Sequence, residues 1–450
     1  MDGCSPMDAT KYDRLLNLWL RLKTSLWFIP VLMTLGAGVI AVLALRIDSD
    51  LLPEGERVWW LYSGNPESAS DLLATLLSSI ITMATLAISI TMVVLTLAAS
   101  QLGPRLIRSF IGNQRTQASL GFFIMTIVYL LLVYRRIDDQ LSAENVPHVA
   151  ITLGSVLSLA CVFLLLFYVH HLASSIVSDT VINRVGGEMD DLIERLLPEA
   201  GTVDSRDARS EADVPDEAGG KPLGLPKGGY VQTIGYAALV KLAQEHDVTL
   251  MLRFRAGSHL LAGGRHVLVL PQERASEELA GKIAEAIVLG PDSTPTQDLE
   301  FSLRQMVEAG LRALSPGIND PYTAVAVIDR LAASIALVMR RDMEPAVHRD
   351  EEGVARLVTR PVTFTGLIDR AYNELRQAAS TSPAILIHLL DSLAELACHC
   401  RTAQQRDALA RHAGMIASAG HRSVEEEGDA MAVSARYDAV LSSLAAREVS

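Results

Sequence analysis

The sequence predicts a mainly α-helical membrane protein, with four transmembrane helices followed by a cytoplasmic part that holds a small α/β module and a helical bundle. Four uncharged apolar runs of spanning length lie in the first 171 residues. Charge is also uneven, because residues 1–171 carry 11 Lys/Arg and 12 Asp/Glu, whereas residues 172–450 carry 28 and 40. The formal charge of −13 therefore belongs almost entirely to the second part. This acidity argues against a nucleic-acid partner.

The four apolar runs are predicted to be membrane helices. The first, 26–45, is longer than the apolar core of a signal peptide, and no small-x-small cleavage site follows it. The other three are 72–102, about 117–134 and about 149–169. A span needs about 20 apolar residues, so all four qualify and the second must tilt or protrude. They must be helices, because lipid offers no partner to backbone polar groups.

The basic residues beside these runs predict their orientation. Seven flank the cytoplasmic side and four the other: Lys11, Arg14, Arg21, Lys23, Arg105, Arg108 and Arg115, against Arg46, Arg57, Arg135 and Arg136. The excess of positive charge at one side favours a cytoplasmic N-terminus in the bacterial inner (plasma) membrane. Because four spans return the chain to its starting side, the C-terminus is expected in the cytoplasm as well.

A stripe of hydroxyl residues marks the second run. At about 100° per residue, seven Ser/Thr project into an arc of about 80° and extend over about 37 Å. The stripe consists of Thr75, Ser78, Thr82, Thr85, Ser89, Thr96 and Ser100.

This stripe has two interpretations. Small hydroxyl residues let helices approach closely and bond to one another, so the stripe can be a packing seam inside the bundle. It can also line a water-filled path that several subunits assemble, with Met92 and Val93 as an apolar gate. No Asp, Glu, Lys, Arg or His lies within the four spans, which disfavours a proton- or ion-coupled carrier.

Composition and periodicity divide the chain further. An amphipathic connector helix is expected to break at Gly186–Gly187, and the acidic, Pro/Gly-rich stretch after it reads as a flexible linker. The module should hold a strand, a helix, a second strand and a hairpin at 259–270, with helices alone beyond Pro271. The predicted segments are 1–25 (N-terminal cytoplasmic or interfacial), 26–171 (four spans), 172–199 (connector), 200–228 (linker), 229–272 (α/β module) and 273–450 (cytoplasmic helical domain).

The corner SPGINDPYT separates two predicted helices of the cytoplasmic part. Asp320 suits the N-cap of the second helix, with Pro321 as its first residue. The corner is either a well-capped turn or, through free N–H groups, an anion site. Catalysis is disfavoured because no base is near in sequence and no nucleophile elbow occurs. The candidate residues are Ser315, Pro316, Gly317, Asn319, Asp320, Pro321 and Thr323.

No cofactor or metal is expected. Cys398, His399 and Cys400 lack further ligands at a recognisable spacing, so they do not indicate a metal site. No nucleotide-binding loop or nucleophile–base constellation supports an enzyme.

Several motifs resemble one known family. RLKTSLWFIPVLM (21–33), SIITMATLAISITMVVLTLAASQLGPRLIRSF (79–110), ALSPGINDPYTAVAVIDRL (313–331) and SPAILIHLLDSLAELA (382–397) are similar to bacterial predicted membrane proteins grouped as domain of unknown function 2254. The resemblance covers about residues 15–400, and the SPGIND corner is its most specific part. It implies an integral inner-membrane protein and no particular activity.

Two functional hypotheses follow from these patterns. The first is a homo-oligomeric, channel-like protein in the lipid bilayer, with a Ser/Thr-lined path for small ions that the cytoplasmic domain assembles or regulates. The second is a non-conducting membrane sensor or scaffold whose cytoplasmic domain binds a ligand or partner protein.

Overall fold

The computed structural model divides the chain into two compact units. The first runs from Leu18 to Thr180, and the second from Val181 to Ser450. Each unit is described by itself. The residues that the structure describes are 27–50, 61–102, 114–137, 146–175, 178–201 and 217–446.

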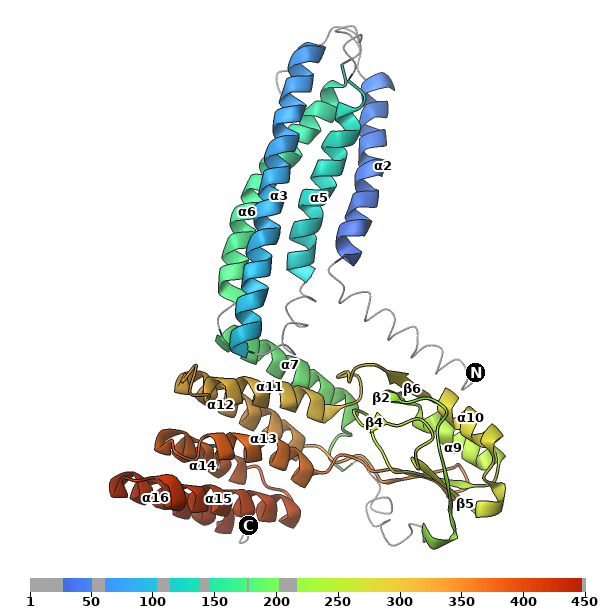
Figure 1. Cartoon of the computed structure of the whole chain (residues 1–450), viewed down its shortest axis with the longest axis vertical. Coiled ribbons are helices and arrows are strands. Elements are labelled where there is room, and N and C mark those ends of the chain that lie inside the picture. Colours follow the sequence, from blue (N-terminus) through green and yellow to red (C-terminus); the bar gives the residue numbers. More distant parts are fainter. Residues whose placement is uncertain are drawn as a thin grey trace. The chain divides into compact units, whose positions relative to one another are not determined.

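The first unit contains long apolar helices that run side by side (Figure 1). Their bounds are α2 (Phe28–Asp50), α3 (Pro66–Leu102), α5 (Gln114–Tyr134) and α6 (His148–Ser175). All four coincide with the predicted spans, and α3 and α6 extend beyond the apolar runs at one or both ends.

Helix α5 is the most enclosed helix of this unit. Its apolar window is 56% buried, whereas those of α2, α3 and α6 are 22%, 28% and 28% buried. Gly121 lets α2 approach closely, since a Cβ there would lie 3.1 Å from the Cα of Pro30. The buried Tyr129 hydroxyl donates to the carbonyl of Ala150 at 2.9 Å and links α5 to α6. Close packing and satisfied polar groups thus join these helices without charges.

Helix α7 (Ser178–Leu196), which belongs to the second unit from Val181 onward, runs unbroken through Gly186 and Gly187. The predicted break is therefore wrong. A Cβ at Gly186 would lie 1.9 Å from Nε of Arg330, so this glycine permits a close contact rather than ending a helix.

Two small sheets form the α/β part of the second unit. One has the order β1-β5-β3-β8-β7, in which β3 and β8 are parallel, and the other has the order β4-β2-β6. The elements are η3 (Glu217–Gly219), β1 (Lys221–Leu223), β2 (Gly229–Ile234), α9 (Tyr236–Glu245), β3 (Thr249–Leu252), β4 (His259–Leu260), β5 (Val267–Leu270), η4 (Gln272–Arg274), α10 (Glu277–Glu285), β6 (Ile287–Gly290), β7 (Val347–Arg349) and β8 (Ala355–Val358).

This part corrects three predictions. The expected hairpin at 259–270 does not form, because β4 pairs with β2 while β5 pairs with β3 and β1. Strands also occur beyond Pro271, and β8 returns from far along the chain to pair with β3, so the module extends past 229–272. The linker expected at 200–228 is ordered at its end, where β1 joins the sheet, while 202–216 lie outside the described residues.

The helical part of the second unit stacks in layers, α11 with α12, then α13 with α14, then α15 with α16 (Figure 1). Residues predicted to face inward are buried, including Leu303, Met306, Ile328 and Leu331. The helices are α11 (Leu299–Ala313), α12 (Pro321–Met339), α13 (Phe364–Ala378), α14 (Pro383–Ala397), α15 (Ala403–Ser423) and α16 (Glu427–Ala445).

Five of the described helices, rather than the four expected, are long and apolar enough to cross a membrane. The fifth is α12, which packs in the stack of the second unit and is 56% buried over its apolar window. A buried helix in a large helical domain has the same apolar composition as a span. Hydropathy alone therefore does not distinguish α12 from the other four.

Candidate functional site

The outer face of α3 carries the predicted hydroxyl stripe. Six of its seven members are exposed: Thr75, Ser78, Thr82, Thr85, Ser89 and Thr96. Ser100 lies within the helix, but its side chain is outside the described part. Among the described residues, no neighbouring helix of the same chain covers these six side chains.

Backbone carbonyls of the same helix bind several of these hydroxyls. Thr75 donates to Asp71 O at 2.8 Å, and Thr82 donates to Ser78 O at 2.9 Å. Thr85 and Thr96 donate in the same way to the carbonyls four residues earlier. This back-bonding satisfies the hydroxyl proton inside a membrane helix. The oxygen lone pairs stay available on the exposed side.

Apolar side chains flank the stripe. Met92 and Val93, the predicted gate, are 60% and 68% exposed. At about 100° per residue they lie on opposite sides of the stripe, between Ser89 and Thr96. The structure thus places both residues on the same face as the hydroxyls, although it does not test whether they form a gate.

Two carboxylates extend this face beyond the predicted stripe. Glu67 and Asp71 are both exposed in the first turns of α3. Asp71 lies four residues before Thr75, and Glu67 four residues before Asp71, so both fall on the stripe side of the helix. Sequence reasoning missed them because it started the span at 72, and the four-residue spacing was the available signal.

The described apolar windows of α2 and α6 expose no hydroxyl residue, whereas α3 exposes its hydroxyls together with the large apolar side chains Ile81, Leu86, Ile88, Met92, Val93 and Leu97. Along their apolar windows, the exposed large side chains are Val31, Leu32, Leu35, Val39, Ile40, Val42, Leu43 and Ile47 on α2, and Val156, Leu159, Val162, Phe163, Leu166, Phe167 and Val169 on α6. Such surfaces suit contact with lipid tails. Thr91 of α3 points inward instead, where its hydroxyl bonds to Ala87 O at 2.6 Å and to the Tyr168 hydroxyl of α6.

The SPGINDPYT corner is a capped turn, as one interpretation predicted. Asp320 accepts from the backbone N–H of Thr323 at 3.1 Å and from its hydroxyl at 2.6 Å. These bonds lower the pKa of Asp320. Pro321 opens α12, and Asn319 adopts a left-handed conformation with φ of 50°. The Ser315 hydroxyl donates to Arg312 O at 2.6 Å, so Asp320 and Ser315 are engaged in ending one helix and starting the next.

Helix α7 is bound along α12. The Arg330 guanidinium donates to the Asp190 carboxylate at 2.6 Å, directly beside Gly186. Arg341, just beyond α12, donates to Leu197 O at 2.9 Å. These contacts join the helix that follows the last apolar span to the helical stack. The sequence offered no signal for this pairing, because the partners lie about 140 residues apart.

Two buried carboxylates mark the start of α11. Asp298, with 2% of its side chain exposed, receives a hydrogen bond from Arg304 at 2.6 Å. Burial raises the pKa of Asp298, while Arg304 opposes this shift. Glu300, with 7% of its side chain exposed, is paired with Arg255. Each acid thus has an arginine partner: Arg304 binds Asp298 within the first turns of α11, whereas Arg255 joins Glu300 of α11 to another segment.

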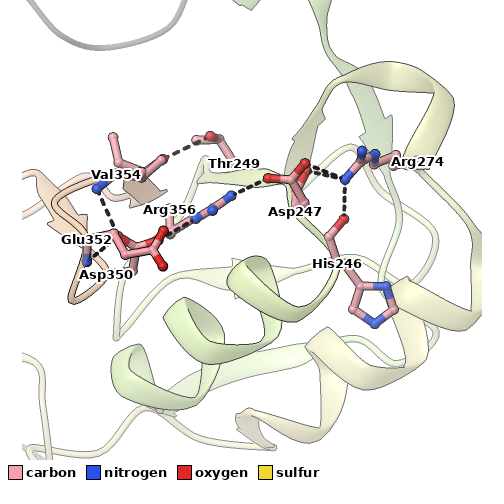
Figure 2. A network of polar contacts seen from close by, with 9 residues as sticks. His246, Asp247, Thr249, Arg274, Asp350, Glu352, Val354 and Arg356 are labelled. Atoms are coloured by element: carbon pink, nitrogen blue, oxygen red, sulfur yellow. Dashed lines mark hydrogen bonds and ion pairs between the residues drawn. The ribbon is translucent and has the colours of Figure 1, made fainter.

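A charged network in the α/β part is also internally satisfied (Figure 2). Arg356 donates to Asp350 at 2.7 Å and to Asp247 at 3.0 Å. Arg274 donates to Asp247 and to the carbonyl of His246. Hydrogen bonds from Arg356 and Arg274 lower the pKa of Asp247. The network fastens β8 and η4 to the end of α9, and this role accounts for its charges.

The sequence matches proteins whose names state no activity. The family described as predicted membrane protein (DUF2254) matches residues 23–395. Uncharacterized protein Rv1290c of Mycobacterium tuberculosis is 28% identical over 415 residues, which cover 91% of this chain and 78% of the relative. Uncharacterized protein Mb1321c of Mycobacterium bovis is similar to the same extent. No solved structure matches this chain.

Proposed function

This chain belongs to the predicted membrane protein family DUF2254, and we propose that it acts as a homo-oligomeric, channel-like protein of the bacterial inner membrane. The outer faces of α3 from several subunits would surround a narrow path for small ions. The second unit would assemble or regulate this path from the cytoplasm, where both termini lie.

The proposal that both termini are cytoplasmic needs four spans, although five described helices are apolar enough to cross a membrane. Helix α12 carries Asp329 and Arg330 at its middle, and both are paired within the second unit, with His388 at 2.5 Å and Asp190 at 2.6 Å. Charged residues at the centre of a lipid-exposed span are costly. We therefore assign α12 to the cytoplasmic stack and the spans to α2, α3, α5 and α6.

The observation that carries the proposal is the contrast among the exposed helix faces. All three helices expose large apolar side chains, but among the described residues of their apolar windows α3 alone exposes hydroxyls, in a row that Met92 and Val93 interrupt and that leads to the carboxylates of Glu67 and Asp71. A hydroxyl row gains nothing from lipid tails, but it hydrates an ion without trapping it. The symmetric way to keep the row from lipid is to bring copies of α3 together around an axis.

The bonding of the hydroxyls favours cations. Because Thr82 and Thr85 donate their protons to their own helix, they present lone pairs outward. Glu67 and Asp71 would add negative charge at the entrance, which concentrates cations. Met92 and Val93 would form an apolar constriction that closes by dewetting.

Ion flux through liposomes that contain the purified full-length protein tests the proposal. Thr85→Leu and Ser89→Leu should each reduce cation flux about tenfold or more, since they replace hydroxyls with apolar bulk in a narrow path. Ser89→Thr keeps the hydroxyl and should keep the flux. Val162→Leu, on the exposed face of α6, is the control for added bulk outside the path. Absence of flux from the unsubstituted protein under all ionic conditions contradicts the channel.

Thiol labelling tests the position of the stripe independently. Cysteines at 82, 85 and 89 should react with a membrane-impermeant, polar thiol reagent in proteoliposomes, whereas a cysteine at 162 should not. Equal silence at all four positions would place the stripe in lipid or in a dry interface.

The second candidate function is a non-conducting sensor or scaffold, which the layered helix pairs of the second unit favour. Stacked helix pairs offer extended surfaces for protein partners, an argument that rests on analogy of architecture. Silent cysteines together with absent flux support this alternative.

A further inference from the structure

The corner between α11 and α12 exposes an uncharged, partly apolar tip. Tyr322 is 84% exposed and Ile318 is 41% exposed. The remaining exposed residues of this tip are Pro316, Gly317, Asn319 and Pro321. A tyrosine so fully exposed beside an isoleucine is notable in a unit whose surface is rich in acidic residues, because both side chains prefer an apolar or interfacial environment.

The tip is held in one conformation by bonds that do not use these two side chains. Asp320 binds the backbone and hydroxyl of Thr323, and the backbone N–H of Asp320 donates to Ala313 O at 2.8 Å. The one acidic residue of the tip is thus half-buried and bonded to the start of α12. Capping therefore accounts for Asp320 and leaves Ile318 and Tyr322 without a role inside the unit.

The pairing of α7 with α12 places this tip at a defined end of the second unit. Gly186 of α7 contacts Arg330 of α12. The carbonyl of Leu197 accepts a hydrogen bond from Arg341, and each of these two residues lies eleven positions after its counterpart in the first contact. The two helices therefore run in the same direction. Tyr322 lies eight residues before Arg330, and Ser178 lies eight residues before Gly186. Each is therefore about 12 Å along its helix from the contact of Gly186 with Arg330. Tyr322 is level with the first turn of α7.

That first turn follows the last apolar helix closely along the chain. Helix α6 ends at Ser175 and α7 begins at Ser178, so about 10 Å of chain separates the last apolar helix from α7. Tyr322 is thus level with the part of α7 that follows α6 most closely along the chain.

We propose that Ile318 and Tyr322 insert into the interfacial layer of the lipid bilayer and anchor the second unit to the membrane surface. Tyrosine is enriched at this depth because its ring enters the acyl boundary while its hydroxyl stays among headgroups and water. The one charge of the tip, that of Asp320, is half-buried and bonded to the start of α12. This anchor is independent of the proposed channel, because it needs only a membrane protein with α7 following its last span.

Depth measurement by spin labelling tests the anchor in the full-length protein in nanodiscs. Labels are placed by Tyr322→Cys and Ile318→Cys in a background with Cys4→Ser and Cys398→Ser. Relaxation by lipid-soluble O₂ is compared with relaxation by the water-soluble complex NiEDDA. Both labels should respond more strongly to O₂, by a factor of about two or more over control labels.

The controls are Leu261→Cys and Met431→Cys, at side chains 68% and 67% exposed and remote from the tip in sequence. They should respond mainly to NiEDDA. Labels at 318 and 322 that behave like these controls place the tip in water and overturn the proposal. Labels shielded from both reagents also overturn it, since they place the tip against protein, either a second copy or another segment. Folding is not at risk at Tyr322, and Ile318→Cys gives a second, independent reading.

Discussion

The exposed hydroxyls of α3 in the first unit and the paired charges of the second unit satisfy their hydrogen bonds in opposite ways. Along α3, hydroxyls such as those of Thr82 and Thr85 bond to carbonyls of their own helix and remain exposed. In the second unit, charged groups bind partners far away in the chain, such as Arg330 with Asp190 and Arg356 with Asp247. The first arrangement needs no neighbour, because a membrane helix must satisfy its groups internally. The second specifies which elements meet.

Substitutions at these two kinds of residue should therefore differ in their effect on stability. Loss of an exposed hydroxyl on α3 should affect folding little, whereas loss of a buried charge in the second unit should affect folding strongly. Substitutions at buried charges, at a close helix contact, at the two faces of α3 and at one buried histidine should therefore have successively smaller effects on stability.

Arg304→Met should destabilise the protein most, by about 3 kcal/mol, because it leaves Asp298 buried without its cation. Chemical denaturation of the detergent-solubilised full chain, followed by circular dichroism, measures the loss. The double variant Arg304→Met with Asp298→Asn removes both charges and should recover part of the stability. A loss in the double variant as large as that in the single one would show that the packing of Arg304, rather than the unpaired charge of Asp298, causes the loss.

Gly186→Ala should cost about 1–3 kcal/mol, because its Cβ must displace Arg330 from Asp190. Gly187→Ala is the matched control, since no atom lies within 4 Å of the added Cβ. It should stabilise the helix by about 0.5–1 kcal/mol. Thermal unfolding of both variants compares them, and equal shifts would contradict the close contact of α7 with α12.

Thr91→Val and Thr82→Val compare the two faces of α3. Thr91 reaches the Tyr168 hydroxyl inside the bundle, so its replacement should cost about 0.6–1.7 kcal/mol, the range of bonds between membrane helices. Thr82 bonds only within its own helix in the described structure, and Thr82→Val should change stability by less than about 0.5 kcal/mol. Reversible unfolding in mixed micelles measures both. A larger effect at Thr82 would indicate a folding role for the stripe.

His412 should make a small pH-dependent contribution. Burial lowers the pKa of His412 below the ordinary 6.5. The hydrogen bond to Asp369 raises this pKa, whereas the positive charges of Arg411 and Arg376 lower it further. The unfolded chain then binds a proton more readily than the folded one, so stability falls as pH drops below about 6.5. His412→Gln should reduce the change of the unfolding midpoint with pH between about pH 6.5 and 5. An unchanged slope would assign the pH dependence to other groups.

Much of the architecture was predictable because its causes are local. Four charge-free runs long enough to span lipid became α2, α3, α5 and α6, and Asp320 and Pro321 began α12 as their chemistry favours. The hydroxyl stripe was also visible, since helical spacing alone puts its members on one face. Which way that face points was not predictable, because it depends on which helices pack against α3.

The wrong predictions share a cause that is not local. Two glycines predicted a helix break, yet Gly186 serves a contact with an arginine 144 residues later. The strands of 259–270 looked like a hairpin, yet each pairs in a different sheet. Strand β8 pairs with β3 across more than 100 residues, which no short pattern encodes.

Hydrophobicity, charge and capping act over a few residues, and the apolar helices, the acidity of the second part and the capped corner could therefore be predicted from sequence. The outward direction of the α3 hydroxyls, the pairing of α7 with α12 and the exposure of Tyr322 came from the three-dimensional structure alone. Those features depend on packing between distant segments, where burial and charge pairing, rather than local preference, select the arrangement.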